Sequence, residues 1–404
     1  MHQSHTSQHP RKGISRITVY LALLFSTSFA MFSMFFGSGN LVFPLMIGKV
    51  VGDQYASAIL GLMLTGVVIP FLGLFALLLF SGSYKRFFGR FDKYTSFIVP
   101  LFILTLIGPL AGIPRCITVA YGSFSLLVDN LSLPVFSVCM CGVIFLLTLD
   151  HNKIIPLLGS ILTPFLLVSL ALIIYYGVVQ SPPLEVGPSV EKAFTVGMIE
   201  GYQTMDLLAA FFFGATVVHY MKRKLYHRVH SGVAKRRMIL ASLIMGATLL
   251  GIIYAFLVYL GGGYAPILNM EQAERSLALI AYETLGPLAG PIVSTAVVLA
   301  CLTTAIVLTS VSTEFYYEKI LRKKVNLHVV TVATLLGAFS ISILQFKGIA
   351  LFLKPILDAT YPSIIVFTFV SIAYKLWKFR PLKAPVFITF FITLMVMLTT
   401  RVLF

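Results

Sequence analysis

Residues 37–40 read Gly37-Ser38-Gly39-Asn40 and lie in the middle of an apolar stretch that is long enough to cross a membrane. The run from Ile17 to Gly48 is hydrophobic and contains no charged residue. Glycine and asparagine are poor helix formers, so this segment predicts an interruption of the helix. Backbone groups that are freed inside a bilayer must be satisfied by protein or by a watery cavity. An interrupted first span of this kind is typical of a transporter's binding site.

The composition is typical of a protein with many membrane-spanning helices. Hydrophobic residues make up 58% of the 404-residue chain and charged residues 11%, and the mean hydropathy is +0.95. An average soluble domain has about 25% charged residues. Because one crossing needs about 20 apolar residues, we predict an all-α polytopic protein with about eleven transmembrane helices. The spans are expected at 17–48, 55–80, 95–121, 134–149, 154–179, 193–219, 237–261, 287–316, 325–344, 349–374 and 384–403.

Basic residues are distributed unevenly between the two sets of loops that these spans define. Of the 30 Lys and Arg residues, 23 fall in the N-terminal tail and in alternate loops, 5 on the opposite side and 2 within spans. Loops rich in Lys and Arg stay on the cytoplasmic side and face anionic lipid headgroups. The asymmetry predicts a cytoplasmic N-terminus, and it excludes a nucleic-acid partner because no basic hydrophilic domain is expected. The first 16 residues are polar and precede a span too long for a signal peptide, so no cleaved leader is expected.

The interrupted first span predicts a second interruption in the other half of the chain. Transporters with inverted repeats carry broken helices at corresponding positions of both halves. The chain would then consist of a polar tail at 1–16, a first repeat of five helices at 17–179, a second repeat at 193–374 and an additional helix at 384–404. The sixth span is therefore expected to be broken, like the first.

The sixth span contains Glu200, Gly201, Thr204, Asp206 and Gly214, and we expect its break between Thr204 and Gly214. Acidic residues inside a span are costly and are functional by default. The alternative to a functional role for Glu200 is a structural one, in which its side chain lies near the outer membrane interface. The alternative for Asp206 is a hydrogen-bonded carboxylate that stabilises helix packing.

The eighth span carries a polar face. Thr303 and Thr304 follow Ala300 by three and four residues, so two hydroxyls and a carbonyl lie on one side of a helix. A hard monovalent cation is bound by such neutral oxygens. Hydroxyls in spans also bond to carbonyls of their own helix or join helices without any ligand, and this alternative stays open.

Five segments follow the order of motifs in one known family. They read Phe35-Phe36-Gly37-Ser38-Gly39-Asn40-Leu41-Val42-Phe43-Pro44, Ile113-Pro114-Arg115 with Thr118-Val119, Gly201-Tyr202-Gln203-Thr204-Met205-Asp206, Ala300-Cys301-Leu302-Thr303-Thr304-Ala305-Ile306, and Tyr361-Pro362. The chain thereby resembles the bacterial branched-chain amino acid:cation symporters between residues 31 and 362. The first and fourth of these segments are the most specific. The chain departs from the family at Tyr121-Gly122, where relatives often have a glutamate, so Arg115 is expected to pair elsewhere, with Asp206 or Asp358. Relatives also tend to have a twelfth span.

The resemblance implies a leucine-transporter-like fold of two inverted five-helix repeats with broken helices 1 and 6. It implies uptake of leucine, isoleucine or valine coupled to Na⁺, without another cofactor, across a bacterial inner membrane. The substrate would be bound by Gly37, Ser38, Gly39, Asn40, Thr204, Asp206 and Ala209. Sodium would be bound by Ser33, Phe36, Asn40, Ala300, Thr303 and Thr304, with Asn40 either a direct ligand or a brace for the broken backbone.

Two other functions compete with sodium-coupled uptake. The same fold could use protons, with Asp206, Glu200 or Glu314 as the titrating group. A sensor that binds an amino acid without moving it is the second alternative. An enzyme is not expected, because the chain contains no His-Glu-x-x-His motif and no Ser/His pair with catalytic spacing.

Overall fold

The computed structural model describes residues 16–128, 130–149, 162–225, 232–286, 290–381 and 383–402. The predicted polar tail, apart from Arg16, and the beginning of the predicted span 154–179 lie outside the described residues. The described parts of the chain form helices and no strand, which confirms the prediction of an all-α protein.

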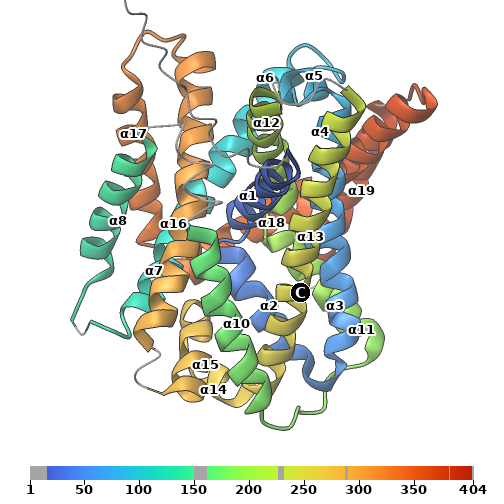
Figure 1. Cartoon of the computed structure of the whole chain (residues 1–404). Helices are drawn as coiled ribbons and strands as arrows, with labels where there is room; N and C mark the ends of the chain where they lie inside the picture. Colours follow the sequence, from blue (N-terminus) through green and yellow to red (C-terminus); the bar gives the residue numbers. More distant parts are fainter. Residues whose placement is uncertain are drawn as a thin grey trace, which may run out of the picture.

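The helices follow one another with short connections, and Figure 1 shows α1 and α2 near the middle of the bundle, with α8 and α17 on one flank and α19 on the other. The first half contains α1 (Arg16–Phe35), α2 (Ser38–Val51), α3 (Tyr55–Leu62), α4 (Ile69–Leu79), α5 (Tyr84–Phe88), α6 (Thr95–Thr105), α7 (Gly112–Phe124), α8 (Leu133–Thr148) and α10 (Thr163–Val179). The second half contains α11 (Val190–Gln203), α12 (Asp206–Leu225), α13 (Gly232–Gly263), α14 (Ala265–Asn269), α15 (Ser276–Leu285), α16 (Gly290–Phe315), α17 (Leu327–Ser342), α18 (Gln345–Trp377) and α19 (Lys383–Val402).

Many of these helices are long and apolar enough for a membrane. Among the described residues, five continuous stretches are long and apolar enough to cross a membrane, and the bent pair α11–α12 meets the same criteria as one broken span. Shorter apolar helices include α8, α10 and α17. The protein is therefore a multi-pass membrane protein, while the count of eleven spans and the inverted repeats stay predictions.

The first span is interrupted between α1 and α2, where the sequence predicts it. Gly37 has an extended backbone (φ −118°, ψ −155°) between the two helices. A Cβ atom at this position would lie 2.8 Å from the Thr304 hydroxyl oxygen, so glycine is required by the close approach of α16.

The sixth span is interrupted at Thr204 and Met205, within the expected interval. α11 and α12 are bent by 47° across this break. Met205 adopts the left-handed backbone conformation with φ 61°, which ends one helix and redirects the chain into the next.

A third irregularity, in the third span, was not expected. Gly108 has non-helical torsion angles (φ −85°, ψ −112°) in the π-helical stretch Leu106–Leu110. Pro109 follows directly, and proline cannot donate the backbone hydrogen bond that a continuous helix needs. α7 begins at Gly112, shortly after this irregularity, and packs against α2.

Glycines bring the half-helices together. A Cβ atom at Gly48 or Gly261 would collide with backbone of the partner helix in the α2–α13 pair, and Gly61 and Gly197 have the same role between α3 and α11. Small residues allow helices in a membrane to approach closely. This packing fixes α2 and α11, whose ends border the candidate site.

The segment between α13 and α16 covers one end of the bundle. It consists of α14, a short 3₁₀ turn at Ala273–Arg275 and α15, and Figure 1 shows it at the end opposite to α5. Two short helices, α14 and α15, thus lie over this face. We refer to the two ends of the bundle as the α5 face and the α14 face.

Candidate substrate and cation site

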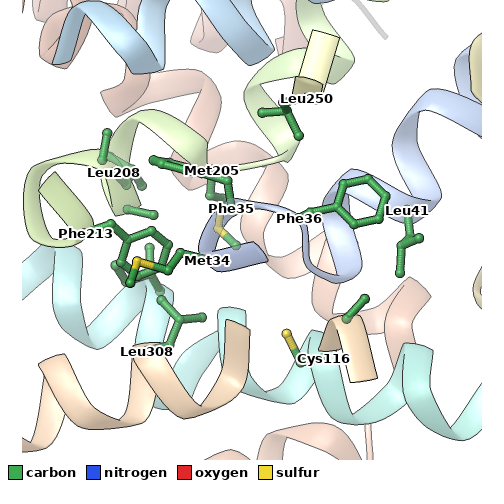
Figure 2. Packing of buried hydrophobic residues seen from close by; sticks show 14 of the residues in the cluster. Met34, Phe35, Phe36, Leu41, Cys116, Met205, Leu208, Phe213, Leu250 and Leu308 are labelled. Carbon is green, nitrogen blue, oxygen red and sulfur yellow. The ribbon is translucent and has the colours of Figure 1, made fainter. Parts of the chain in front are cut away.

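A small cavity lies where the broken spans meet. Its lining includes Arg115 and Cys116 of α7 and Thr304 of α16. It also includes all of the predicted substrate residues, which are Gly37, Ser38, Gly39, Asn40, Thr204, Asp206 and Ala209. Figure 2 shows its apolar surroundings, with Met34, Phe35 and Phe213 on one side of the chain between α1 and α2 and Cys116 on the other. Its volume of about 30 Å³ is close to the space of one water molecule, so a bound amino acid requires the walls to separate.

Asn40 joins the two breaks. Its side-chain amide donates a hydrogen bond of 2.8 Å to Asp206 Oδ2 and another to the Tyr254 hydroxyl. Its carbonyl oxygen accepts from the Gly37 backbone N–H at 3.3 Å. Both ends of the Asn40 amide are thus occupied by protein, and this arrangement favours a brace over a direct cation ligand.

Asp206 is the first residue of α12 and is 3% exposed. Its Oδ2 atom accepts from Asn40 and, at 3.0 Å, from the Tyr254 hydroxyl. A carboxylate at a helix N-terminus is stabilised by the helix dipole. Within the described ranges no Lys or Arg lies within ion-pair distance of Asp206.

The N-terminus of α2 borders the cavity through Ser38 and Gly39. The first N–H groups of a helix have no partner within the helix. They and the helix dipole favour an anion at this end. The arrangement is therefore suited to a carboxylate group.

Arg115 is fully buried beside the cavity. Its Nη1 atom donates at 2.8 Å to the backbone carbonyl of Gln203, the last residue of α11, and Nη2 donates at 3.4 Å to the Gln203 side chain. The C-terminus of a helix carries a partial negative charge, so Arg115 stabilises the broken end of α11. Among the described residues, Arg115 forms an ion pair with neither Asp206 nor Asp358, the partners expected from the sequence.

The threonines of α16 contact the C-terminal end of α1. The Thr303 hydroxyl donates to the carbonyls of Ser33 at 3.2 Å and Ala300 at 2.8 Å. The Thr304 hydroxyl lies 3.2 Å from the carbonyls of Ser33 and Met34. The structure therefore gathers five neutral oxygens, four from predicted ligands and one from the carbonyl of Met34. This is the donor set that a sodium ion takes. The role of Phe36 as a sodium ligand stays a prediction.

The comparisons with known proteins agree with this architecture. The sequence profile described as branched-chain amino acid transport protein matches residues 22–403. The chain belongs to this family. It is a family of transport proteins rather than enzymes, which confirms the family predicted from the motifs and the expectation that the protein is not an enzyme.

Relatives of the transporter cover most of its length. It is 34% identical to the branched-chain amino acid permease BraB of Bacillus subtilis over 371 residues, which are 87% of this chain and 80% of BraB. It is 32% identical over 354 residues to the permease BrnQ of Corynebacterium glutamicum, covering 86% of this chain and 80% of the relative.

Solved structures support the fold. Mhp1, a nucleobase-cation-symport-1 family transporter solved in a closed conformation with bromovinylhydantoin, is 15% identical, with a TM-score of 0.62 over 88% of this chain and 79% of that one. A Na⁺-coupled sialic acid symporter has a TM-score of 0.57 at 12% identity, over 90% of this chain and 87% of that one. At these identities the likeness shows the fold of the transporter alone.

Two vestibules approach the cavity of the transporter from opposite faces. The one on the α5 face has a volume of about 590 Å³ and shares Met34 with the cavity lining. The one on the α14 face has a volume of about 840 Å³ and reaches Phe43 and Phe346. The Arg115 guanidinium lies 5.3 Å and 5.6 Å from the centres of these two rings, so the three side chains form the barrier on that face.

Sequence reasoning assigned no role in this site to two tyrosines, although Tyr361 belongs to the fifth motif. Tyr254 lies in the middle of α13, and Tyr361 of α18 accepts a hydrogen bond of 3.0 Å from the Leu207 backbone N–H. Both hydroxyls satisfy groups at the start of α12. A buried tyrosine hydroxyl usually has a hydrogen-bond partner. A tyrosine at the centre of an apolar span therefore indicates a buried polar group nearby, and this pattern could have identified both residues from the sequence.

Proposed function

We propose that the transporter imports leucine, isoleucine or valine together with Na⁺ by alternating access across a bacterial inner membrane. The observation that carries this proposal is the position of Thr304, which lines the cavity and also contacts the carbonyls of Ser33 and Met34. One side chain thereby belongs to both the candidate substrate site and the candidate cation site. The excess of basic residues in the loops on the α5 face supports a cytoplasmic location of that face.

The substrate is proposed to bind between the two breaks. Its carboxylate would lie at the N-terminus of α2, near Ser38 and Gly39, because unpaired N–H groups favour an anion there. Its ammonium group would face Asp206. The aliphatic side chain would contact Met205 and Ala209 of the sixth span, which line the same cavity.

Sodium is proposed to bind where α1 ends against α16. A cation there would be coordinated by the hydroxyls of Thr303 and Thr304 in place of their present bonds to carbonyls. It would hold the end of α1 against α16 and thereby fix the position of Gly37, whose backbone approaches Thr304. Binding at the two sites would then be coupled, and the coupling would act equally in both directions.

Proton coupling is the second candidate function, and a specific observation favours it. Asp206 is a buried carboxylate that is hydrogen-bonded to Asn40 and Tyr254, and no described cationic side chain lies within ion-pair distance. A proton on Asp206 would neutralise a charge that is costly inside the membrane. In that case a pH gradient would drive uptake without sodium.

Uptake of labelled leucine into proteoliposomes separates these functions. An inward sodium gradient at equal pH is expected to drive accumulation, and the variant Thr303→Ala/Thr304→Ala is expected to abolish it. Thr313→Ala is the matched control, because among the described residues the Thr313 hydroxyl bonds only to the Thr309 and Ser310 carbonyls of its own helix. Accumulation driven by a pH gradient without sodium would instead support proton coupling. Binding without accumulation would support a sensor and contradict both proposals.

A further inference from the structure

A basic pocket lies at the surface of the protein, away from the candidate transport site. It has a volume of about 650 Å³ and lies between the α5–α6 connection and the α18–α19 connection. Its lining includes Arg90, Phe91, Tyr374, Arg380 and Lys383. Among the described residues no acidic side chain belongs to this lining, so the charged groups that line the pocket are cationic.

The position of Arg90 is fixed by the fold. Its guanidinium carbon lies 3.4 Å from the centre of the Tyr374 ring. Nη1 contacts the Val370 carbonyl at 3.5 Å and Nη2 contacts the Phe379 carbonyl at 3.4 Å. A planar guanidinium held in this way is suited to the oxygens of a phosphate group.

The other two cations remain free to approach a ligand. The side chains of Arg380 and Lys383 are exposed on either side of Pro381. The Lys383 ammonium lies 5.8 Å from the centre of the Phe91 ring, which places it beside the entrance defined by the loop 89–94. Three cations therefore converge on one pocket from two connections of the chain.

The pocket continues into an apolar surface. Phe91 and Phe387 pack with their ring centres 5.3 Å apart, and α19 then exposes Phe387, Ile388 and Phe391 along its length. Trp377, at the end of α18, is 74% exposed. Exposed aromatic residues at helix ends are typical of the membrane–water interface. Figure 1 shows α19 at the outer edge of the bundle.

We propose that this pocket binds the phosphate headgroup of an anionic glycerophospholipid, whose acyl chains lie along the exposed face of α19. The three cationic side chains would attract the negatively charged headgroup. The adjoining apolar surface of α19 would contact acyl chains, which a soluble phosphate does not have. Basic pockets between membrane helices bind such headgroups. The lipid would connect the loop 89–94 to α18 and α19.

Native mass spectrometry of the purified full-length protein tests the proposal. Phosphatidylglycerol and cardiolipin are expected to bind, whereas phosphatidylcholine is not. The variant Arg90→Gln/Arg380→Gln/Lys383→Gln is expected to weaken binding by about 100-fold, because each basic residue near an anionic membrane surface strengthens binding about fivefold. The matched control is Arg86→Gln/Arg322→Gln/Lys324→Gln, which removes the same charge from exposed positions outside the pocket and is expected to retain most of the binding.

Two results would overturn the proposal. One is equal weakening in the pocket variant and in the charge-matched control, which indicates attraction to the surface as a whole. The other is displacement of the bound lipid by millimolar inorganic phosphate, which indicates a site for a soluble anion. If the triple variant elutes as an aggregate, Arg380→Gln/Lys383→Gln replaces it, since both side chains are exposed, and a loss of about 20-fold is expected.

Discussion

Asn40 and Asp206 are 166 residues apart in the chain and join the two broken spans through a hydrogen bond of 2.8 Å. Each residue lies in the first turn of a helix that begins at a break, α2 for Asn40 and α12 for Asp206. Tyr254 of α13 contacts both side chains. The bond fixes the distance between the two helix N-termini, and the candidate substrate site lies between them.

Replacing Asn40 tests whether it is a brace or a cation ligand. Asn40→Ala leaves the Asp206 carboxylate with one buried partner fewer, and a hydrogen bond to a charged group contributes about 1.5–3 kcal/mol. We expect a lower melting temperature and a lower maximal uptake rate, with little change in the sodium concentration for half-maximal uptake. Sodium-dependent leucine uptake and thermal unfolding measure the two effects. A large increase of that sodium concentration at unchanged thermal stability would show that Asn40 is a direct ligand.

Replacing Arg115 tests its role at the end of α11. Arg115→Met removes a charged donor from the Gln203 carbonyl, so we expect a loss of about 1.5–3 kcal/mol in stability. Arg115→Lys keeps the charge but loses the two-pronged geometry, and an intermediate loss is expected. Thermal unfolding in one detergent measures the difference, with Arg86→Met, at an exposed position, as the control. Equal melting temperatures for Arg115→Met and the unsubstituted protein would contradict the structural role.

The break in the first span could be predicted from its local sequence, and the break in the sixth span from the correspondence expected between the two halves of the chain. Gly37, Gly39 and Asn40 weaken a helix wherever it lies, and two acids in one apolar span indicate a special environment. Thr303 and Thr304 could likewise be identified as candidate cation ligands, because their hydroxyls lie on one face of the eighth span. The structure brings both threonines to Ser33, at the end of the interrupted first helix.

The partners across the bundle could not be predicted, because they depend on how distant helices pack. Arg115 was expected to pair with a carboxylate, but the end of a broken helix supplies the negative charge instead. Tyr254 is 214 residues from Asn40, and its role requires α13 to pack against α2 through Gly48 and Gly261. The residue pattern within a single span does not show which residues of distant helices will contact it.

Phe346 is expected to keep the cavity closed toward the α14 face. Cys116 lines the cavity and is buried, so it serves as a natural reporter once the other three cysteines, Cys139, Cys141 and Cys301, are replaced by serine. We expect a membrane-impermeant thiol reagent to modify Cys116 faster in Phe346→Ala, because the ring beside Arg115 is removed. Phe352→Ala, on an exposed position of the same helix, is the control. Equal rates of modification in the two variants would show that the barrier lies elsewhere.

Glu274 is expected to make the stability of the α14 face dependent on pH. Its side chain is 8% exposed and packs against Gly122 of α7, and this burial raises the pKa of its carboxyl, with a smaller opposing effect of Arg275. The folded state then binds the proton of the Glu274 carboxyl more tightly than the unfolded state does. The resulting stabilisation of the folded protein is complete below the pKa of the carboxyl in the unfolded state, about 4.3, and is lost as pH rises through its pKa in the folded state. We expect Glu274→Gln to reduce the fall of the melting temperature as pH rises above about 4.3, measured against Glu283→Gln. A pH dependence identical to that of the unsubstituted protein would contradict this role.

Gly37→Ala is expected to disturb the candidate cation site without replacing a side chain that binds the ion. The added Cβ would lie 2.8 Å from the Thr304 hydroxyl oxygen and 2.9 Å from its methyl carbon, so α1 and α16 must separate. Since the candidate sodium site is formed by these two helices, we expect the sodium concentration for half-maximal leucine uptake to rise by about tenfold, the equivalent of about 1.4 kcal/mol. Gly142→Ala is the matched control, because a Cβ there meets no atom within 4 Å. If both variants keep the sodium dependence of the unsubstituted protein, the sodium ion does not bind between Ser33 and Thr304, and the proposed coupling through Thr304 fails with it.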